Sequence, residues 1–190
     1  MAKTIIFGAT GKLGAYSALY LKEHGHDVIA VGRRVSDNGF FADHEIPYYS
    51  VNIQNPDDFK KLPKTDIGNI LHYAAVMPAA MEGYDPNVYI QNIMLGTLNI
   101  LEYGREVGIN KIVYTHSHAD TAHLMGKEEL IPADIQRSFP LKGDHSIYSI
   151  CKNASVDLIE HYYHEFGIKR FILRLPTIYT FTSDPFFYVD

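Results

Sequence analysis

A tyrosine and a lysine lie four residues apart in the stretch IYSICK, residues 147–152, inside a pattern that predicts an amphipathic helix. On an α-helix this spacing places Tyr148 and Lys152 on one face, one turn apart. A cationic ammonium group beside the phenol favours its ionised form, and Tyr148 would then act as a base near neutral pH. The same spacing also arises by chance in a chain with 14 tyrosines, so the pair is informative only in the context of the predicted fold.

A glycine-rich turn is predicted near the start of the chain, in the stretch GATGKLG, residues 8–14. Its three glycines directly follow a strand pattern and open a helical one. Glycines in this place let the backbone turn tightly and approach a pyrophosphate, whose charge meets the amide groups and dipole of the helix N-terminus. Their spacing is three and three, whereas the commonest fingerprint has two and three, and the alternative is a tight turn without a ligand. The predicted cofactor-binding residues of this turn are Gly8, Thr10, Gly11, Lys12, Leu13 and Gly14.

The second predicted strand ends in VGRR, residues 31–34, and this ending bears on the choice of dinucleotide. An acidic residue there would accept hydrogen bonds from the ribose hydroxyls of NAD, whereas an arginine can neutralise the 2′-phosphate of NADP. Gly32 occupies the expected position of the acid, and Arg33 and Arg34 follow it. We therefore expect NADP to be favoured over NAD, with Arg33 as the contact. The alternative is that both arginines are solvated loop residues.

Strand and helix patterns alternate along the chain, which predicts right-handed crossovers and a parallel sheet covered on both faces. The expected fold is therefore an α/β domain with a doubly wound parallel sheet and a single core. Gly108 and Gly167 follow two of the helical patterns and predict helix ends, whereas 118–145 has no clear periodicity. The predicted strands cover residues 3–8, 27–32, 47–52, 69–75, 111–117 and 169–175, and the predicted helices cover 12–24, 56–62, 86–107 and 146–166.

Composition restricts the classes of protein and partner. Hydrophobic residues make up 46% of the chain and charged residues 21%, the proportions of a folded globular domain. The net charge of −5, with basic and acidic residues interspersed, argues against a nucleic-acid partner. No stretch approaches membrane-spanning length and the N-terminus has no signal-peptide pattern, so we expect no membrane partner. Cys151 is the only cysteine, which excludes an intrachain disulfide and fits the cytoplasm.

The glycine turn followed by Tyr148 and Lys152 on a late helix resembles the extended short-chain dehydrogenase/reductase family. That family includes NAD(P)-dependent epimerases and dehydratases of sugar nucleotides, of the UDP-glucose 4-epimerase kind. The resemblance implies a Rossmann-type NAD(P)-binding domain over residues 1–190, a nucleotide-sugar substrate and a homodimer. Further stretches agree in the same order along the chain: HYAA at 72–75, NIMLGTLNILEYGREVGINKIVYTHS at 92–117 and LRLPTIY at 173–179.

By this resemblance the catalytic residues are Tyr148, Lys152 and Ser117. Tyr148 would exchange a proton with a sugar hydroxyl while hydride passes between the sugar carbon and the nicotinamide. Lys152 would lower the pKa of Tyr148 and hydrogen-bond the nicotinamide ribose, so both residues are also expected cofactor contacts. Ser117 would orient the substrate, although the family's serine triplet reads THS here. Asn92 matches a largely structural position, and the other implied cofactor contacts are Asn52, Ile53, Ala74 and Ala75.

Departures from the family leave a second function open. Members of the family continue beyond the sixth strand into a smaller domain that holds the substrate nucleotide, and we expect residues 1–190 to lack this C-terminal substrate domain. The tyrosine-glycine pair that follows the family's serine is also absent from 118–145, which leaves substrate recognition open. The alternative function is a non-catalytic redox sensor that binds NADP. Retention of the tyrosine, lysine and serine favours an enzyme.

A group of histidines raises the separate possibility of a metal site. His116, His118 and Asp120 would share one face if the fifth strand continued that far, and His123 follows. Imidazole and carboxylate groups are common zinc ligands, but no cysteine or glutamate completes a recognised spacing. We therefore expect polar loop residues here and no metal.

Overall fold

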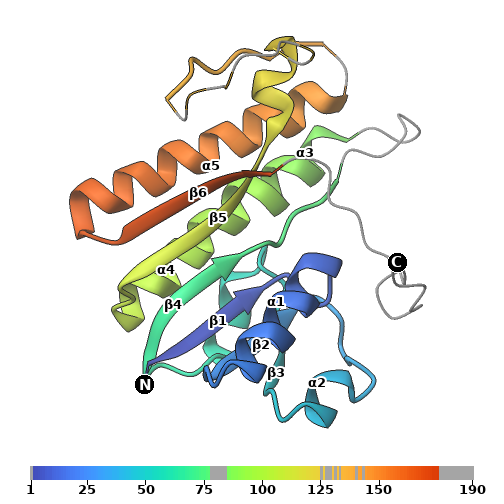
Figure 1. Cartoon of the computed structure of the whole chain (residues 1–190), viewed down its shortest axis with the longest axis vertical. Coiled ribbons are helices and arrows are strands. Elements are labelled where there is room, and N and C mark those ends of the chain that lie inside the picture. The colour runs from blue at the N-terminus through green and yellow to red at the C-terminus, as the bar shows by residue number, and fades with distance from the viewer. Residues whose placement is uncertain are drawn as a thin grey trace.

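A computed structural model describes residues 2–77, 85–124, 126, 130, 132, 134–139, 141–142 and 144–175 (Figure 1). Six parallel strands form one sheet in the order β3-β2-β1-β4-β5-β6. The strand order reverses between β1 and β4, and sheets of this kind bind ligands outside the carboxyl ends of the strands at that point. The strands are β1 (Lys3–Phe7), β2 (Val28–Gly32), β3 (Tyr48–Ser50), β4 (Ile67–His72), β5 (Lys111–Ser117) and β6 (Lys169–Leu175).

Helices cover both faces of the sheet, as the doubly wound prediction requires (Figure 1). On one face a small core around Ile6, Ala18 and Phe41 joins β1 and β2 to α1 and α2. On the other face a larger core around Ile70 and Ile112 lies beneath α4 and α5. None of the described helices is long and apolar enough to cross a lipid bilayer. The helices that cover the sheet are α1 (Lys12–Glu23), α2 (Phe40–Asp43), α4 (Gly96–Val107) and α5 (Asp144–Phe166).

The predicted helix over 86–107 is interrupted by a wide turn. It begins as α3 (Pro86–Tyr89), continues as a π turn over Ile90–Leu95, and only then becomes α4. The carbonyl oxygen of Ile93 in this turn accepts hydrogen bonds from the hydroxyl groups of Thr97, at 2.5 Å, and Ser155, at 3.1 Å. The apolar period of the sequence did not predict the turn, because its partner Ser155 lies on a different helix.

Other elements differ from the prediction in extent or type. The segment Pro56–Lys61 is a 3-10 helix, begun by the Asn55 side chain, which accepts a hydrogen bond from the Asp57 amide. The predicted strands at 47–52 and 69–75 are β3 and β4, which cover 48–50 and 67–72. Helix α2 was not predicted, since four residues are too few to show a helical period.

Candidate functional site

The glycine turn lies at the carboxyl end of β1, where the strand order reverses. Gly8 has a φ of +83°, and a Cβ atom there would lie 2.6 Å from the amide nitrogen of Ala74. A Cβ on Gly14 would lie 2.2 Å from the carbonyl oxygen of Gly8. These two positions therefore require glycine. Gly11 is the N-cap of α1 and has no side chain to cap the helix, and the N-terminus of a helix is a favourable place for an anion.

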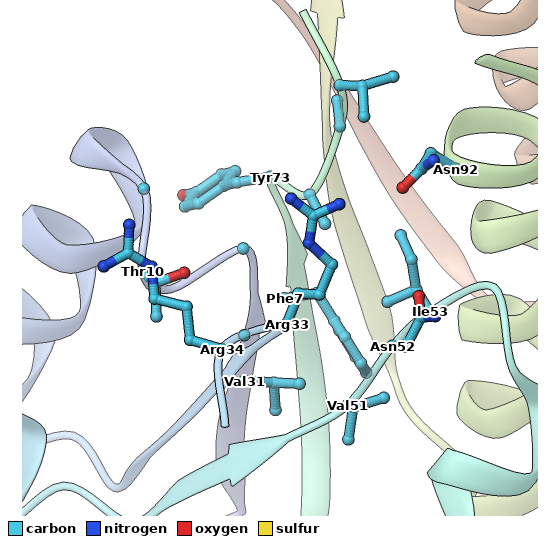
Figure 2. Close-up of a pocket in the computed structure, with 16 residues that line it drawn as sticks. Phe7, Thr10, Val31, Arg33, Arg34, Val51, Asn52, Ile53, Tyr73 and Asn92 are labelled. Carbon is cyan, nitrogen blue, oxygen red and sulfur yellow. The ribbon is translucent and has the colours of Figure 1, made fainter. Parts of the chain in front are cut away.

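A cavity of about 570 Å³ opens beside this turn (Figure 2). Its volume is in the range of pockets that hold small molecules and cofactors. Five predicted cofactor residues are not among those that line it: Lys12, Leu13 and Gly14, which form the first turn of α1, and Tyr148 and Lys152, which lie on α5. The predicted residues that do line the cavity are Gly8, Thr10, Gly11, Arg33, Asn52, Ile53, Ala74 and Ala75.

The cavity also includes residues that sequence reasoning did not assign to the cofactor. Asn92 lines it and donates a hydrogen bond from Nδ2 to the carbonyl oxygen of Val88 at 2.8 Å, so it contributes to the structure and to the wall. Tyr73 and Val76 flank the two predicted alanines after β4 and belong to the same wall. Their position beside those alanines was the signal that would have identified them.

The end of β2 also lines the cavity. A Cβ atom on Gly32 would lie 2.7 Å from Thr10 Cγ2 and 2.9 Å from the hydroxyl oxygen of Tyr48. An acidic side chain therefore has no room at this position unless both neighbours move. Figure 2 shows the Arg33 side chain extending over the middle of the cavity, while Arg34 lies beside Thr10.

Tyr148 and Ser117 are brought together next to this cavity, although neither lines it. Tyr148 lies on α5, is 6% exposed, and packs in a cluster with Tyr89 and Ile93. Ala75, from the cavity wall, packs against the same cluster. Ser117, at the end of β5, lies close enough to Tyr148 for its side chain to lower the pKa of the Tyr148 hydroxyl. The predicted tyrosine and serine therefore form a pair directly behind the cavity wall.

Lys152 is directed into the protein interior. Its Nζ atom donates a hydrogen bond to the carbonyl oxygen of Thr115 at 2.8 Å and lies 4.7 Å from the centre of the Tyr114 ring. Burial lowers the pKa of Lys152 from 10.5 to about 7. Burial also raises the pKa of Tyr148, and the side chain of Ser117 opposes this increase. The expected lowering of the Tyr148 pKa by Lys152 is not found here. The Nζ atom of Lys152 is bound to Thr115 and lies 5.9 Å from the centre of the Tyr148 ring.

Burial of Lys152 predicts that stability falls as the solution is acidified. Between its ordinary pKa of 10.5 and its folded pKa of about 7, the lysine is protonated only in the unfolded chain, so the free energy of unfolding decreases as the pH falls through this window. His72 continues the trend, because burial lowers its pKa from 6.5 to about 3. Lys152→Met removes the need for this side chain to lose its proton on folding, and is expected to raise the melting temperature at pH ~7 by several degrees.

Thermal melts between pH ~6 and ~10 measure this effect. The difference between Lys152→Met and the unmodified chain is expected to shrink as the pH approaches ~10. Lys60→Met is the matched control, since the Lys60 side chain is 79% exposed and the same substitution there changes no buried charge. If the difference in melting temperature between Lys152→Met and the unmodified chain is the same at every pH, the lowered pKa of Lys152 is contradicted.

The histidine group does not form the strand face that a continued β5 would give. β5 ends at Ser117, and His118–Leu124 form a 3-10 turn, so the strand alternation stops before Asp120. Asp120 instead lies 3.0 Å from His116 Nε2 and also binds Arg174. Within the described parts of the chain, no group of three or more His, Cys, Asp or Glu side chains is placed to hold a metal ion.

Comparison with known proteins identifies relatives over nearly the whole chain. The family model described as NAD dependent epimerase/dehydratase family matches residues 4–185. A Methanocaldococcus jannaschii protein that is proposed to be a UDP-glucose 4-epimerase is 28% identical over 183 residues, covering 95% of this chain and 57% of that protein. The UDP-glucose 4-epimerase of Neisseria meningitidis serogroup C is 23% identical over 145 residues, covering 70% and 43%. The chain thus spans about half the length of the curated relatives it matches.

Solved structures share the fold of this chain. The UDP-glucose 4-epimerase of Thermus thermophilus, in complex with NAD, has a TM-score of 0.79 at 19% identity, over 96% of this chain and 58% of that one. The L-threonine dehydrogenase of Clostridium difficile has a TM-score of 0.75 at 24% identity, over 93% and 53%. At these identities the structural likeness establishes the fold, and the family model adds the family. The chain belongs to the NAD dependent epimerase/dehydratase family, within the extended short-chain dehydrogenases/reductases.

Proposed function

We propose that this chain is the dinucleotide-binding part of an NAD(P)-dependent epimerase or dehydratase that acts on a nucleotide sugar. The observation that carries the proposal is the glycine-walled cavity at the switch point of the sheet, with the Tyr148–Ser117 pair packed behind its wall. The named activity of the epimerase relatives supports a nucleotide sugar as the substrate class.

A bound NAD(P) would supply the acceptor and donor of hydride. The residues of this chain suit such a ligand by shape and charge. Gly8 and Gly14 keep the turn free of side chains, and the N-terminus of α1 offers amide groups to a pyrophosphate. Ala74 and Ala75 keep the opposite wall small. Arg33 is the cation nearest the middle of the cavity in Figure 2.

The proton chemistry is assigned to the residues behind the wall. Tyr148 is proposed to exchange a proton with a substrate hydroxyl, and Ser117, its neighbour, to orient both groups. Lys152 has a pKa of about 7, so it changes protonation state near neutral pH. An acid of this kind must be reached by the substrate, so opening of the wall at Ala75 and Val76 is part of the proposal.

NADP is proposed as the preferred dinucleotide. Gly32 supplies no acidic side chain to bind the ribose of NAD, Thr10 and Tyr48 crowd its position, and Arg33 offers a charge to a 2′-phosphate. We expect NADPH to bind more tightly than NADH by about 1–2 kcal/mol, or roughly 5–30-fold. Arg33→Ala is expected to remove most of this difference. Titration of nicotinamide fluorescence with both dinucleotides measures it.

The control for this prediction is Arg105→Ala. Arg105 lies on α4, where it forms an ion pair with Glu102, and it is not a lining residue of the cavity. Its loss should leave the ratio of the two affinities unchanged. Equal binding of NADH and NADPH by the unmodified chain would reject the assignment of Arg33.

The proposed function predicts that residues 1–190 bind a dinucleotide but do not interconvert sugar nucleotides. Turnover requires a sugar held at the nicotinamide, and positioning of this kind accounts for about 7–11 kcal/mol of a reaction barrier. In the resembled family the groups that hold the substrate nucleotide lie largely beyond the region that corresponds to this chain. The test combines fluorescence titration of NAD(P)H with chromatography of UDP-glucose and UDP-galactose incubated with the chain and either dinucleotide.

Four outcomes are distinguished. No dinucleotide binding at all would reject the proposal. Repeated turnover by this chain, at rates within about tenfold of ordinary enzymes, would show that segment 118–145 completes a substrate site by itself. A redox sensor remains the alternative if the protein encoded by the complete reading frame binds NADPH and converts no sugar nucleotide. Conversion by that longer protein would support the epimerase.

A further inference from the structure

Three charged or polar side chains form a network at the carboxyl end of β5, two of them buried and the third half-buried. The His116 Nε2 atom donates a hydrogen bond to Asp120 Oδ2 at 3.0 Å, and Arg174 donates to both carboxylate oxygens at 3.2 Å. The His116 and Asp120 side chains are 2% and 0% exposed. His116 and Arg174 are register partners on β5 and β6, so one carboxylate joins two strands to the turn that follows. None of these contacts was predicted from the sequence.

Two residues of the network, His116 and Asp120, lie on either side of Ser117 in the sequence. His116 precedes Ser117 on β5, and Asp120 follows it in the turn His118–Leu124. The carbonyl oxygen of Asp120 also accepts a hydrogen bond from the amide of Ser138 at 2.9 Å, which ties a distant loop to the same point. Neighbouring residues of a strand point to opposite faces, so fixing His116 on one face fixes the direction of Ser117 on the other.

The protonation of His116 agrees with a positioning role. A carboxylate only accepts hydrogen bonds, so the Nε2 atom carries the proton and Nδ1 is unprotonated. Among the described residues Nδ1 has no hydrogen-bond partner, and burial lowers the pKa of His116, which keeps the ring neutral. Within the described residues the bond to Asp120 is therefore the one hydrogen bond of the ring, and Arg174 in turn binds both oxygens of Asp120.

We propose that His116, Asp120 and Arg174 are positioning residues that set the direction of the Ser117 hydroxyl toward Tyr148. The inference rests on the proposed function, in which this pair of hydroxyl groups handles the substrate proton. It assigns no contact with substrate or dinucleotide to the three residues. Their effect reaches the reaction only through Ser117.

The test observes the hydroxyl pair directly and needs no substrate. Tyrosine labelled with ¹³C at Cζ is incorporated into the 190-residue chain, and Tyr148→Phe identifies the Tyr148 signal. Ser117→Ala, which removes the Ser117 hydroxyl, is expected to move that signal. Arg174→Met should move it in the same direction by at least about half as much, and should add nothing in the Ser117→Ala background, since coupled residues are non-additive.

Arg170→Met is the matched control. Arg170 lies earlier on β6, binds the carboxylate of Glu160, and has 30% side-chain exposure against 24% for Arg174. Its register partner on β5 is Ile112, at the other end of the strand from Ser117, so its loss should leave the Tyr148 signal in place. Asp120→Asn, which keeps the size of the side chain and removes its charge, is the second network variant.

Two results would overturn the proposal. In one, folded Arg174→Met or Asp120→Asn leaves the Tyr148 signal unchanged, or shifts it equally with and without Ser117. In the other, both variants unfold, as measured by circular dichroism, and the network then supports the fold as a whole. Because the signal is read without sugar or dinucleotide, failure here is distinct from failure of the proposed enzyme.

Discussion

Replacing Tyr148 with phenylalanine is expected to slow hydride transfer by about 10²–10⁴-fold, the usual contribution of general acid–base catalysis. The change removes one hydroxyl group and keeps a ring that packs against Tyr89 and Ile93. Because Tyr148 is not a lining residue of the cavity, affinity for NADPH is expected to stay within about twofold. The measurement is single-turnover reduction of bound dinucleotide by UDP-glucose, in the protein encoded by the complete reading frame.

Tyr162→Phe controls for the loss of a buried hydroxyl on the same helix. Tyr162 is 5% exposed, and its hydroxyl group donates to Glu102 on α4 rather than to Ser117. This variant should lose some stability and keep its rate of hydride transfer. If Tyr148→Phe also transfers hydride at a near-normal rate, the tyrosine is a packing residue and the acid–base assignment is wrong.

Gly14→Ala is expected to reduce both the stability of the domain and its affinity for dinucleotide. The added Cβ atom would lie 2.2 Å from the carbonyl oxygen of Gly8 and 2.7 Å from the Cα atom of Ala9, so backbone would have to move. Overpacking of this kind costs about 1–3 kcal/mol or more, a large fraction of the roughly 5–15 kcal/mol that stabilise a typical domain. The glycine turn would shift with it, and we expect NADPH affinity to fall at least ~10-fold.

Gly11→Ala separates this steric effect from the general loss of a glycine. The nearest atom to a Cβ at Gly11 is 3.4 Å away, and its φ of −86° suits any residue. We expect this variant to change the free energy of unfolding by less than about 1 kcal/mol, whatever its effect on the dinucleotide. Urea unfolding of both variants without ligand makes the comparison. Equal destabilisation by the two substitutions would contradict the close packing of Gly14 on the turn.

Local patterns in the sequence were sufficient to predict most of the fold. Alternation of strands and helices predicted the doubly wound sheet, and the glycines predicted to end helices do so, with φ of +72° at Gly108 and +71° at Gly167. The cavity was located largely by its loops, since Thr10, Arg33 and Asn52 follow successive strands that end at one edge of the sheet. Such features depend on neighbours within a few residues, which a sequence displays directly.

Features that depend on contacts between distant segments could not be predicted in this way. The π turn at Ile90–Leu95 is held partly by Ser155, and the turn after β5 is held by Arg174 on another strand. The interior direction of Lys152 depends on the backbone of Thr115. The fold also does not select the reaction, since an L-threonine dehydrogenase and a UDP-glucose 4-epimerase both share it with this chain.

The residues of the site are synthesised in a fixed order during translation, and the sheet can assemble in the same order. Each described strand after β1 pairs with one that has already been synthesised: β2 and β3 extend one edge of the sheet, and β4, β5 and β6 extend the other. The lining residues of the cavity lie between Phe7 and Asn92, whereas Lys152 follows 60 residues later. At about 5–20 residues per second, the ribosome needs roughly 3–12 s to cover that interval. A nascent chain therefore carries the whole cavity lining before the helix with the proton-transfer residues has been synthesised.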